Sequence, residues 1–160
     1  MGKEKKKKSD KKAVSSDSLM EELLGAWMRM AIGIKGNRIL QTLSFNEMVT
    51  CRLLYRAMQE NTNTTATDIC RETRLLKSQV NRLLSDMEKK GLIYRQRDLE
   101  DKRKVLVCMK REGTEIYLAE HARIMELVGQ VCDRLSRKEV ESLVAKMSKT
   151  VSIMDELSEL

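Results

Sequence analysis

Five polar side chains between residues 77 and 82 have the hydrogen-bonding chemistry that DNA bases require. They are Lys77, Ser78, Gln79, Asn81 and Arg82. Gln and Asn can each make two hydrogen bonds to adenine, Arg and Lys bind guanine, and Ser bonds either a base or a phosphate. We therefore expect these residues to contact base edges. The alternative interpretation is an ordinary solvated helix surface.

A second charged cluster follows further along the chain and contains Asp101, Lys102, Arg103 and Lys104. Arg103 is the candidate to enter a minor groove, where A·T tracts concentrate negative potential. Lys102 and Lys104 are expected to contact the phosphate backbone, and so are Arg71 and Arg74, which lie before the first cluster.

The two clusters need elements that hold them, and the pattern of apolar residues supplies these elements. Val80, Leu83, Leu84 and Met87 recur at helical spacing over residues 77–90, and Gly91 is a natural helix terminator. Two short β runs follow, over residues 92–97 and 105–109, with the charged cluster between them. A helix that leads into a charged hairpin is the arrangement of a winged helix-turn-helix, in which the helix enters the major groove of DNA.

The distribution of charge agrees with this interpretation. The net charge is +7 for the 160 residues. Residues 71–111 hold thirteen basic and six acidic residues, whereas residues 112–160 hold six basic and ten acidic residues. Positive charge gathered on one structural unit is typical of proteins that bind polyanions. A Lys-rich arm over residues 1–15 adds further positive charge, and its composition predicts disorder.

Residues 16–160 are expected to form a single winged-helix domain of mainly α structure. Residues 44–110 would be the DNA-binding unit, with a capping box at Ser44 and Glu47 and a short helix capped by Thr67. Residues 16–40 and 111–160 would be long amphipathic helices, with a further capping box at Ser136 and Glu139. The apolar surface of these helices is larger than a small DNA-binding unit can cover. We therefore expect these helices to form a homodimer interface.

The helix end and the hairpin together resemble the MarR family of bacterial transcription regulators. The resemblance rests on the run from Leu83 to Ile93, LLSDMEKKGLI, and on the run from Asp98 to Val107, DLEDKRKVLV. It covers residues 17–160. The chain departs from the usual family pattern at Leu99, where Pro is common, and at Met109 and Lys110, where Leu and Thr are common.

The resemblance implies a homodimer that binds a pseudo-palindromic operator in double-stranded DNA, usually as a repressor. It also implies release from DNA by a small aromatic acid or by oxidation. Asp101 is then expected to hold a nearby arginine, namely Arg103, Arg95 or Arg97, through a charge-assisted hydrogen bond. Ligand-binding residues stay unassigned, because Met-rich stripes are more often plain core than a pocket lining.

Other classes of function have little support in the sequence. A single His, four scattered cysteines and no Gly-rich phosphate loop argue against an enzyme and against a metal or other cofactor. A thiol-based redox sensor using Cys51, Cys70, Cys108 or Cys132 is one alternative, and a winged helix that binds RNA or protein is another. No apolar run is long enough to cross a membrane, and no secretory signal opens the chain, so we expect a cytoplasmic protein.

Overall fold

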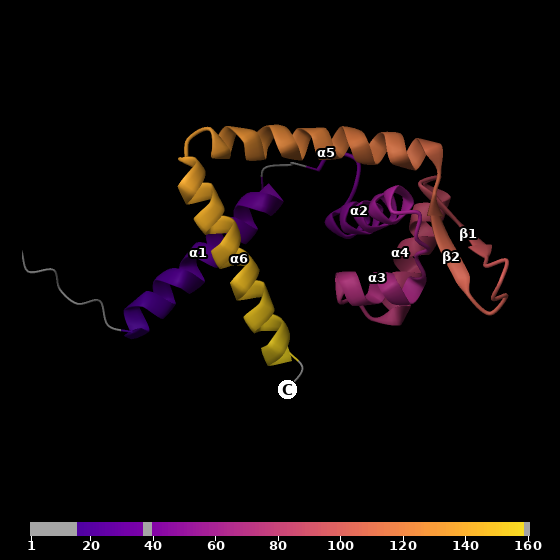
Figure 1. Cartoon of the computed structure of the whole chain (residues 1–160), viewed down its shortest axis with the longest axis horizontal. Helices are drawn as coiled ribbons and strands as arrows, with labels where there is room; N and C mark the ends of the chain where they lie inside the picture. Colours follow the sequence, from indigo (N-terminus) through magenta and orange to yellow (C-terminus); the bar gives the residue numbers. More distant parts are fainter. Residues whose placement is uncertain (1–15, 37–39, 159–160) are drawn as a thin grey trace, which may run out of the picture. The chain divides into compact units, whose positions relative to one another are not determined.

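The computed structural model describes residues 16–36 and 40–158, and the Lys-rich arm at residues 1–15 lies outside the described residues. Its elements follow the order helix, helix, helix, helix, strand, strand, helix, helix (Figure 1). They are α1 (Ser16–Gly36), α2 (Phe45–Gln59), α3 (Ala66–Thr73), α4 (Lys77–Lys89), β1 (Ile93–Arg97), β2 (Val105–Met109), α5 (Arg111–Cys132) and α6 (Arg137–Ser158). The predicted class, mainly α with one β-hairpin, is confirmed.

The chain divides into two units, one containing α1 and the other containing α2 to α6. In α1 the large apolar side chains are exposed along most of the helix. Trp27 is 41% exposed, and Leu19, Leu23 and Met30 are each at least half exposed. A helix this apolar needs a covering surface, because exposed apolar area of this extent is unusual for a free helix.

The hairpin β1–β2 is an antiparallel ladder that pairs Ile93 with Met109 and Arg97 with Val105. A single bridge between Thr65 and Leu106 joins the hairpin to the residue before α3. The antiparallel ribbon that the sequence predicted between residues 92 and 109 is therefore confirmed. The chain between Asp98 and Lys104 forms the tip of the hairpin and is called the wing tip below.

The apolar stripe of α4 lies at the centre of the second unit. Val80, Leu84 and Met87 are fully buried, and Leu83 packs against the core from its edge. Residues of α2, α3, the hairpin and α5 complete this core, among them Leu54, Ile69, Leu92, Val107 and Tyr117. Because this stripe faces inward, the opposite surface of α4 faces solvent.

Local signals fix most helix ends as the sequence indicated. Ser44 and Glu47 form a reciprocal capping box at the start of α2. Ser136 and Glu139 exchange the same hydrogen bonds before α6. The expected cap Thr67 is wrong: Thr65 caps α3, because Asp68 at the third helical position completes a capping box with Thr65. Thr67 lies inside the helix.

The start of α5 packs so closely on the start of β1 that only glycine fits there. A Cβ atom on Gly113 would lie 2.0 Å from the Leu92 carbonyl oxygen. The same oxygen accepts a hydrogen bond of 2.9 Å from the Lys110 amide. Gly113 therefore sets how closely α5 approaches the hairpin.

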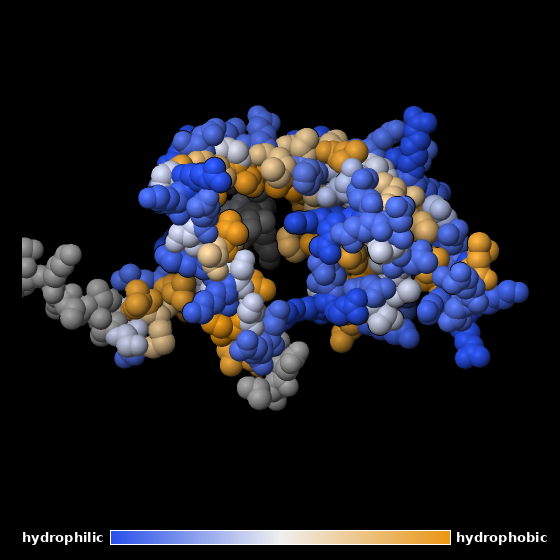
Figure 2. Space-filling view, viewed as in Figure 1, coloured by the Kyte–Doolittle hydropathy of each residue, from blue (hydrophilic) through white to orange (hydrophobic). Residues whose placement is uncertain are grey.

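The C-terminal half of α5 and the whole of α6 carry apolar residues that the chain leaves uncovered. Seven large apolar side chains of α6 are 44–64% exposed. In Figure 2 hydrophobic residues follow α6 along its length, whereas hydrophilic residues cover most of the visible surface of α3 and α4. Among the described residues, no helix is both long and apolar enough to span a bilayer.

Candidate nucleic-acid interface

The first two turns of α4 present the polar residues that the sequence selected. Lys77, Ser78, Gln79, Asn81 and Arg82 are all exposed, and Val80 between them is buried. Because Val80 anchors this part of the helix, its neighbours point outward on one surface. The structure therefore brings the predicted base-contacting set together.

Gln79 has a second task in this helix. Its side-chain Oε1 accepts a hydrogen bond of 2.9 Å from the Leu76 amide. Leu76 precedes the first helical residue and has no side-chain acceptor, so Gln79 satisfies one backbone amide that the helix end leaves free. The Gln79 carboxamide is thereby held near the start of α4, with its NH₂ group left to donate.

The wing tip is shaped by two aspartates that accept backbone hydrogen bonds. Asp98 Oδ1 accepts from the amides of Glu100, at 2.7 Å, and Asp101, at 2.9 Å. These two bonds, Asp101 first, hold the pKa of Asp98 below its ordinary value. Asp101 Oδ1 accepts from the Arg103 amide at 3.1 Å, and its other oxygen lies 3.8 Å from Lys104 Nζ.

The expected contact between Asp101 and an arginine side chain therefore differs from the observed one. Asp101 binds the backbone of Arg103 and leaves its guanidinium free to extend. The short spacing between residues 101 and 103 favours a backbone turn, because Asp side chains readily accept from the amide two residues on. Arg95, another expected partner, pairs with a different acid, as described below.

Arg71 and Arg74 lie beside the turn between α3 and α4, but acidic residues bind both of them. Arg71 is 2.7 Å from Asp68 in the same helix. Arg74 forms an ion pair with Asp155 near the end of α6. Arg74 also has a left-handed backbone, with φ of 56°, at the end of α3. Both guanidiniums are well exposed, so a phosphate could replace either partner.

Four other cations of this surface have no acidic partner. Within residues 40–158 the side chains of Lys77, Arg82, Lys102 and Arg103 take part in no ion pair and no hydrogen bond. Two of them lie on α4 and two on the wing tip. Unpaired cations on neighbouring elements give a local excess of positive charge, which is the feature that a polyanion recognises.

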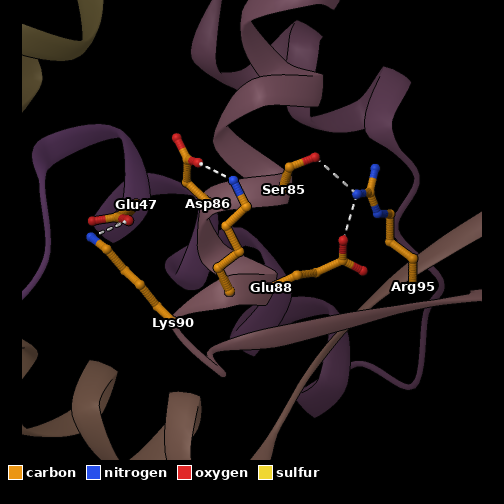
Figure 3. A network of polar contacts seen from close by, with 7 residues as sticks. Glu47, Ser85, Asp86, Glu88, Lys90 and Arg95 are labelled. Atoms are coloured by element: carbon orange, nitrogen blue, oxygen red, sulfur yellow. Dashed lines mark hydrogen bonds and ion pairs between the residues drawn. The ribbon is translucent and has the colours of Figure 1, made fainter.

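The opposite end of α4 is anchored to α2 by an ion pair between an exposed lysine and a buried carboxylate (Figure 3). Lys90 Nζ lies 2.8 Å from Oε1 of Glu47, a residue only 3% exposed. Burial by itself would raise the pKa of Glu47, but hydrogen bonds from Lys90 and from Ser44 outweigh it and lower the pKa. Glu47 therefore completes the capping box of α2 and also anchors α4.

A third charged contact connects α4 to the hairpin. One terminal nitrogen of Arg95 in β1 lies 2.5 Å from Glu88 Oε2 and 3.1 Å from Ser85 Oγ (Figure 3). The hydrogen bond from Arg95 lowers the pKa of Glu88, and the same bond raises the pKa of Arg95. No local signal in the sequence predicts this contact or the contact of Lys90 with Glu47, because each joins two different elements.

The cysteines show no arrangement suited to metal binding. Cys51 is buried, and this burial raises the pKa of its thiol to about 12, so it stays protonated near neutral pH. Cys70, Cys108 and Cys132 are half-buried free thiols. Within the described part of the chain, no group of three or more His, Cys, Asp or Glu residues is placed to hold a metal ion.

The helix-turn-helix of α3 and α4, followed by the antiparallel hairpin, defines a winged helix-turn-helix protein. Residues 46–104, which contain α3, α4 and most of the hairpin, match the model of the MarR family. This match confirms the resemblance drawn from the sequence. The comparison with curated proteins gives no match.

Solved structures of transcription regulators have the same fold. The MepR–DNA complex of S. aureus is 22% identical with a TM-score of 0.62, covering 88% of this chain and 99% of that chain. MepR bound to ethidium bromide is 23% identical with a TM-score of 0.55, covering 87% of this chain and 99% of that one. The regulator BldR from Sulfolobus solfataricus is 20% identical with a TM-score of 0.65, covering 88% and 97% respectively.

Proposed function

We propose that this protein is a transcription regulator that binds double-stranded DNA through α4 and the wing tip. The observation that carries the proposal is the set of unpaired cations on these two elements, beside exposed Ser78, Gln79 and Asn81. The α4 residues suit base edges in the major groove, and the wing residues suit the neighbouring phosphates and minor groove. The MepR–DNA complex, whose fold this chain shares, supports the same assignment.

Binding as a homodimer to a pseudo-palindromic operator is part of the proposal. The exposed apolar stripes of α1, α5 and α6 need a covering surface, and a second copy of the chain supplies the same stripes. A two-fold dimer would place two α4 helices one helical turn of DNA apart or a multiple of it. Repression would follow where such an operator overlaps a promoter.

A duplex selected by the protein from a randomised library is the probe for the interface. Arg103→Ala should weaken binding to it by about 1–3 kcal/mol, because Arg103 is assigned to the minor groove. Lys102→Ala should weaken binding to all sequences alike and reduce the salt slope by about one. Arg137→Ala, on the exposed start of α6, is the control for loss of a positive charge.

Three outcomes would contradict the assignment. Selection that yields no preferred duplex would remove the sequence-specific role. Tighter binding to structured RNA than to any duplex, over a salt series, would favour an RNA-binding winged helix instead. Equal effects of Arg103→Ala and Arg137→Ala would remove the wing from the interface.

We also propose that a small aromatic ligand releases the protein from DNA. A hollow of about 480 Å³ lies along the first half of α5 and is lined by Thr42, Glu112, Glu115, Ile116, Ala119, Glu120 and Arg123. This volume suits a small molecule. The lining holds three acidic residues and one basic residue, and this charge favours a cationic ligand over an aromatic acid.

Titration calorimetry with tetraphenylphosphonium and with salicylate, followed by DNA-release assays, tests the ligand proposal and its charge preference. Release by peroxide that a reductant reverses would instead support the thiol-based alternative. No release by either ligand or by peroxide would leave DNA binding intact and remove the ligand proposal.

A further inference from the structure

The helix α4 and the wing tip must keep a fixed relative position if both are to contact one duplex. Only three residues separate the last helical residue, Lys89, from the first residue of β1, Ile93. Gly91 within this link has a positive φ of 72°. The amides of Gly91 and Leu92 donate to the carbonyls of Glu88 and Met87. This pair of bonds ends the helix, but a short turn cannot by itself fix the direction of the hairpin.

Arg95 supplies a contact between α4 and the hairpin beyond this turn. It occupies the middle of β1, opposite Val107. Side chains alternate along a strand, so Arg95 lies on the same side of β1 as buried Ile93. From there its guanidinium reaches back to Glu88 and Ser85, one helical turn apart on α4 (Figure 3). The contact thus spans the angle between helix and strand.

The pair of Arg95 and Glu88 differs from most ion pairs of the chain. Among the described residues, most pairs join positions three or four apart in sequence, as Arg111 does with Glu115. Arg95 and Glu88 instead belong to different elements, and their side chains are only 31% and 32% exposed. Partial burial and a shared hydroxyl strengthen such a pair relative to an exposed one.

We propose that Arg95 is a positioning residue, which Glu88 and Ser85 hold so that the wing tip meets the DNA backbone while α4 occupies the major groove. This inference rests on the proposed function and adds a role that neither base contacts nor phosphate contacts describe. In this role Glu88, an acid, promotes binding to a polyanion. That sign is opposite to the effect expected from its charge alone.

Glu88→Gln is therefore the decisive variant. If the contact positions the wing, binding to the selected duplex should fall by about five- to tenfold, although a negative charge has been removed. The matched control is Glu100→Gln, which removes an exposed acid of the wing tip and should leave binding unchanged or tighten it by about twofold. Tighter binding of both variants would overturn the proposal, because Glu88 would then act only as a repelling charge.

A second measurement separates positioning from a general loss of structure. If Glu88→Gln acts through the wing, then the loss of binding in the combined Glu88→Gln and Arg103→Ala variant should be smaller than the product of the two single losses. Hydroxyl-radical footprints should lose protection at the flanks of the site and keep it at the centre. Independent, multiplying effects of the two substitutions would contradict the proposal.

Exchange of the two charges covers the case in which Glu88→Gln destabilises the fold. Glu88→Arg with Arg95→Glu restores an ion pair of reversed polarity, and it should recover most of the binding that each single substitution loses. No recovery, with melting temperatures near that of the wild type, would overturn the positioning role. Failure of the wild type to select any duplex would refute the proposed function itself, which is a distinct result.

Discussion

Helices α4 and α6 are both amphipathic, but only α4 has its apolar stripe buried within the chain. Val80, Leu84 and Met87 of α4 are fully buried. Leu143, Met147 and Val151 of α6 also recur at helical spacing and are each about half exposed. The difference shows that amphipathic periodicity predicts a helix but does not say which surface covers it.

The two helices are therefore suited to different roles. Burial of its stripe gives α4 a fixed orientation, so its polar residues can present a defined set of hydrogen-bonding groups. In α6 the polar surface is incidental and the apolar stripe is the part available for recognition. Apolar surface of this extent marks a protein interface more often than a free surface. The predictions below test this contrast.

The largest effect is expected from charges placed on the apolar stripe of α6. Met147→Glu with Val151→Glu should abolish dimers, because burying each unpaired carboxylate costs several kcal/mol. Sedimentation equilibrium would measure the association. The matched control is Ser148→Glu with Ser152→Glu, which adds the same charges to the polar surface of the same helix and should leave the dimer intact. Equal effects of the two pairs would refute the assigned interface.

The next largest effects are expected from truncation of one leucine in α4 and one in α6. Leu84→Ala should lower the free energy of unfolding by about 2–5 kcal/mol, because it leaves a cavity in a fully packed core. Leu143→Ala should instead weaken association, so its effect on unfolding should depend on protein concentration. Chemical denaturation at several concentrations distinguishes the two. A concentration-independent loss of similar size for Leu143→Ala would mean that α6 packs within its own chain.

A buried carboxylate of α5 binds the segment that precedes α2. Glu120 is 1% exposed and accepts hydrogen bonds from the amides of Thr42, at 2.6 Å, and Gln41, at 3.1 Å. Burial would raise its pKa, but these amides and Arg123 outweigh burial and lower it from 4.5. Glu120→Gln should cost about 1.5–3 kcal/mol near neutral pH, since the bonds to a charged acceptor are lost.

The same group makes stability depend on pH. Because the folded pKa lies below the unfolded one, the contribution of Glu120 is complete above about pH 4.5 and is lost as the pH falls through the folded pKa. Unfolding free energies measured between neutral and acidic pH should therefore fall less steeply in Glu120→Gln than in the wild type. Parallel curves for the two proteins would contradict the lowered pKa.

Substitution of two glycines in α5 should change stability by smaller amounts and in opposite directions. Gly113→Ala should destabilise by about 1–3 kcal/mol, because the added Cβ would overlap the Leu92 carbonyl. Gly129→Ala has no atom within 4 Å of the added Cβ, so a gain in helix propensity of up to about 1 kcal/mol should stabilise the chain. Thermal unfolding of both variants would measure the difference. Stabilisation by both would show that α5 can move away from β1.

Gly113 is also an example of a feature that could not be predicted from the sequence. The capping box at Ser44 and the terminator Gly91 could be predicted, because each depends on residues a few positions apart. The polar set on α4 could be predicted because helical periodicity orients it. The wing tip could be predicted because two short β runs flank it. The need for glycine at residue 113 arises from Leu92, which is far away in sequence.

The contacts that position the site depend on tertiary structure in the same way. Arg95 was one of the three arginines predicted as a partner of Asp101, but Glu88 of α4 binds it. An acidic partner close in sequence was available, yet Asp98 and Asp101 are used to form the turn of the wing tip. Whether Arg95 binds an acid that is close in sequence or one on another element depends on how α4 packs against the hairpin.

The smallest effect is expected at the ion pair between Arg74, at the end of α3, and Asp155 of α6. Arg74 is assigned to the DNA backbone, so Asp155 of α6 competes with a phosphate for the same guanidinium. Both side chains are about half exposed, and such a pair contributes about 0.2–1 kcal/mol. Asp155→Asn should therefore tighten DNA binding by no more than about fivefold at low salt, and the gain should fade as salt screens the charges.

Glu156→Gln is the matched control, because it removes one negative charge from the adjacent position of the same helix. If both variants tighten binding equally, the effect is only a reduction of overall negative charge. If Asp155→Asn alone does so, α6 restrains the DNA-binding surface as well as offering an apolar stripe to a partner. A combined Asp155→Asn and Arg74→Ala variant should then show none of the gain, because the guanidinium that the carboxylate restrained is gone.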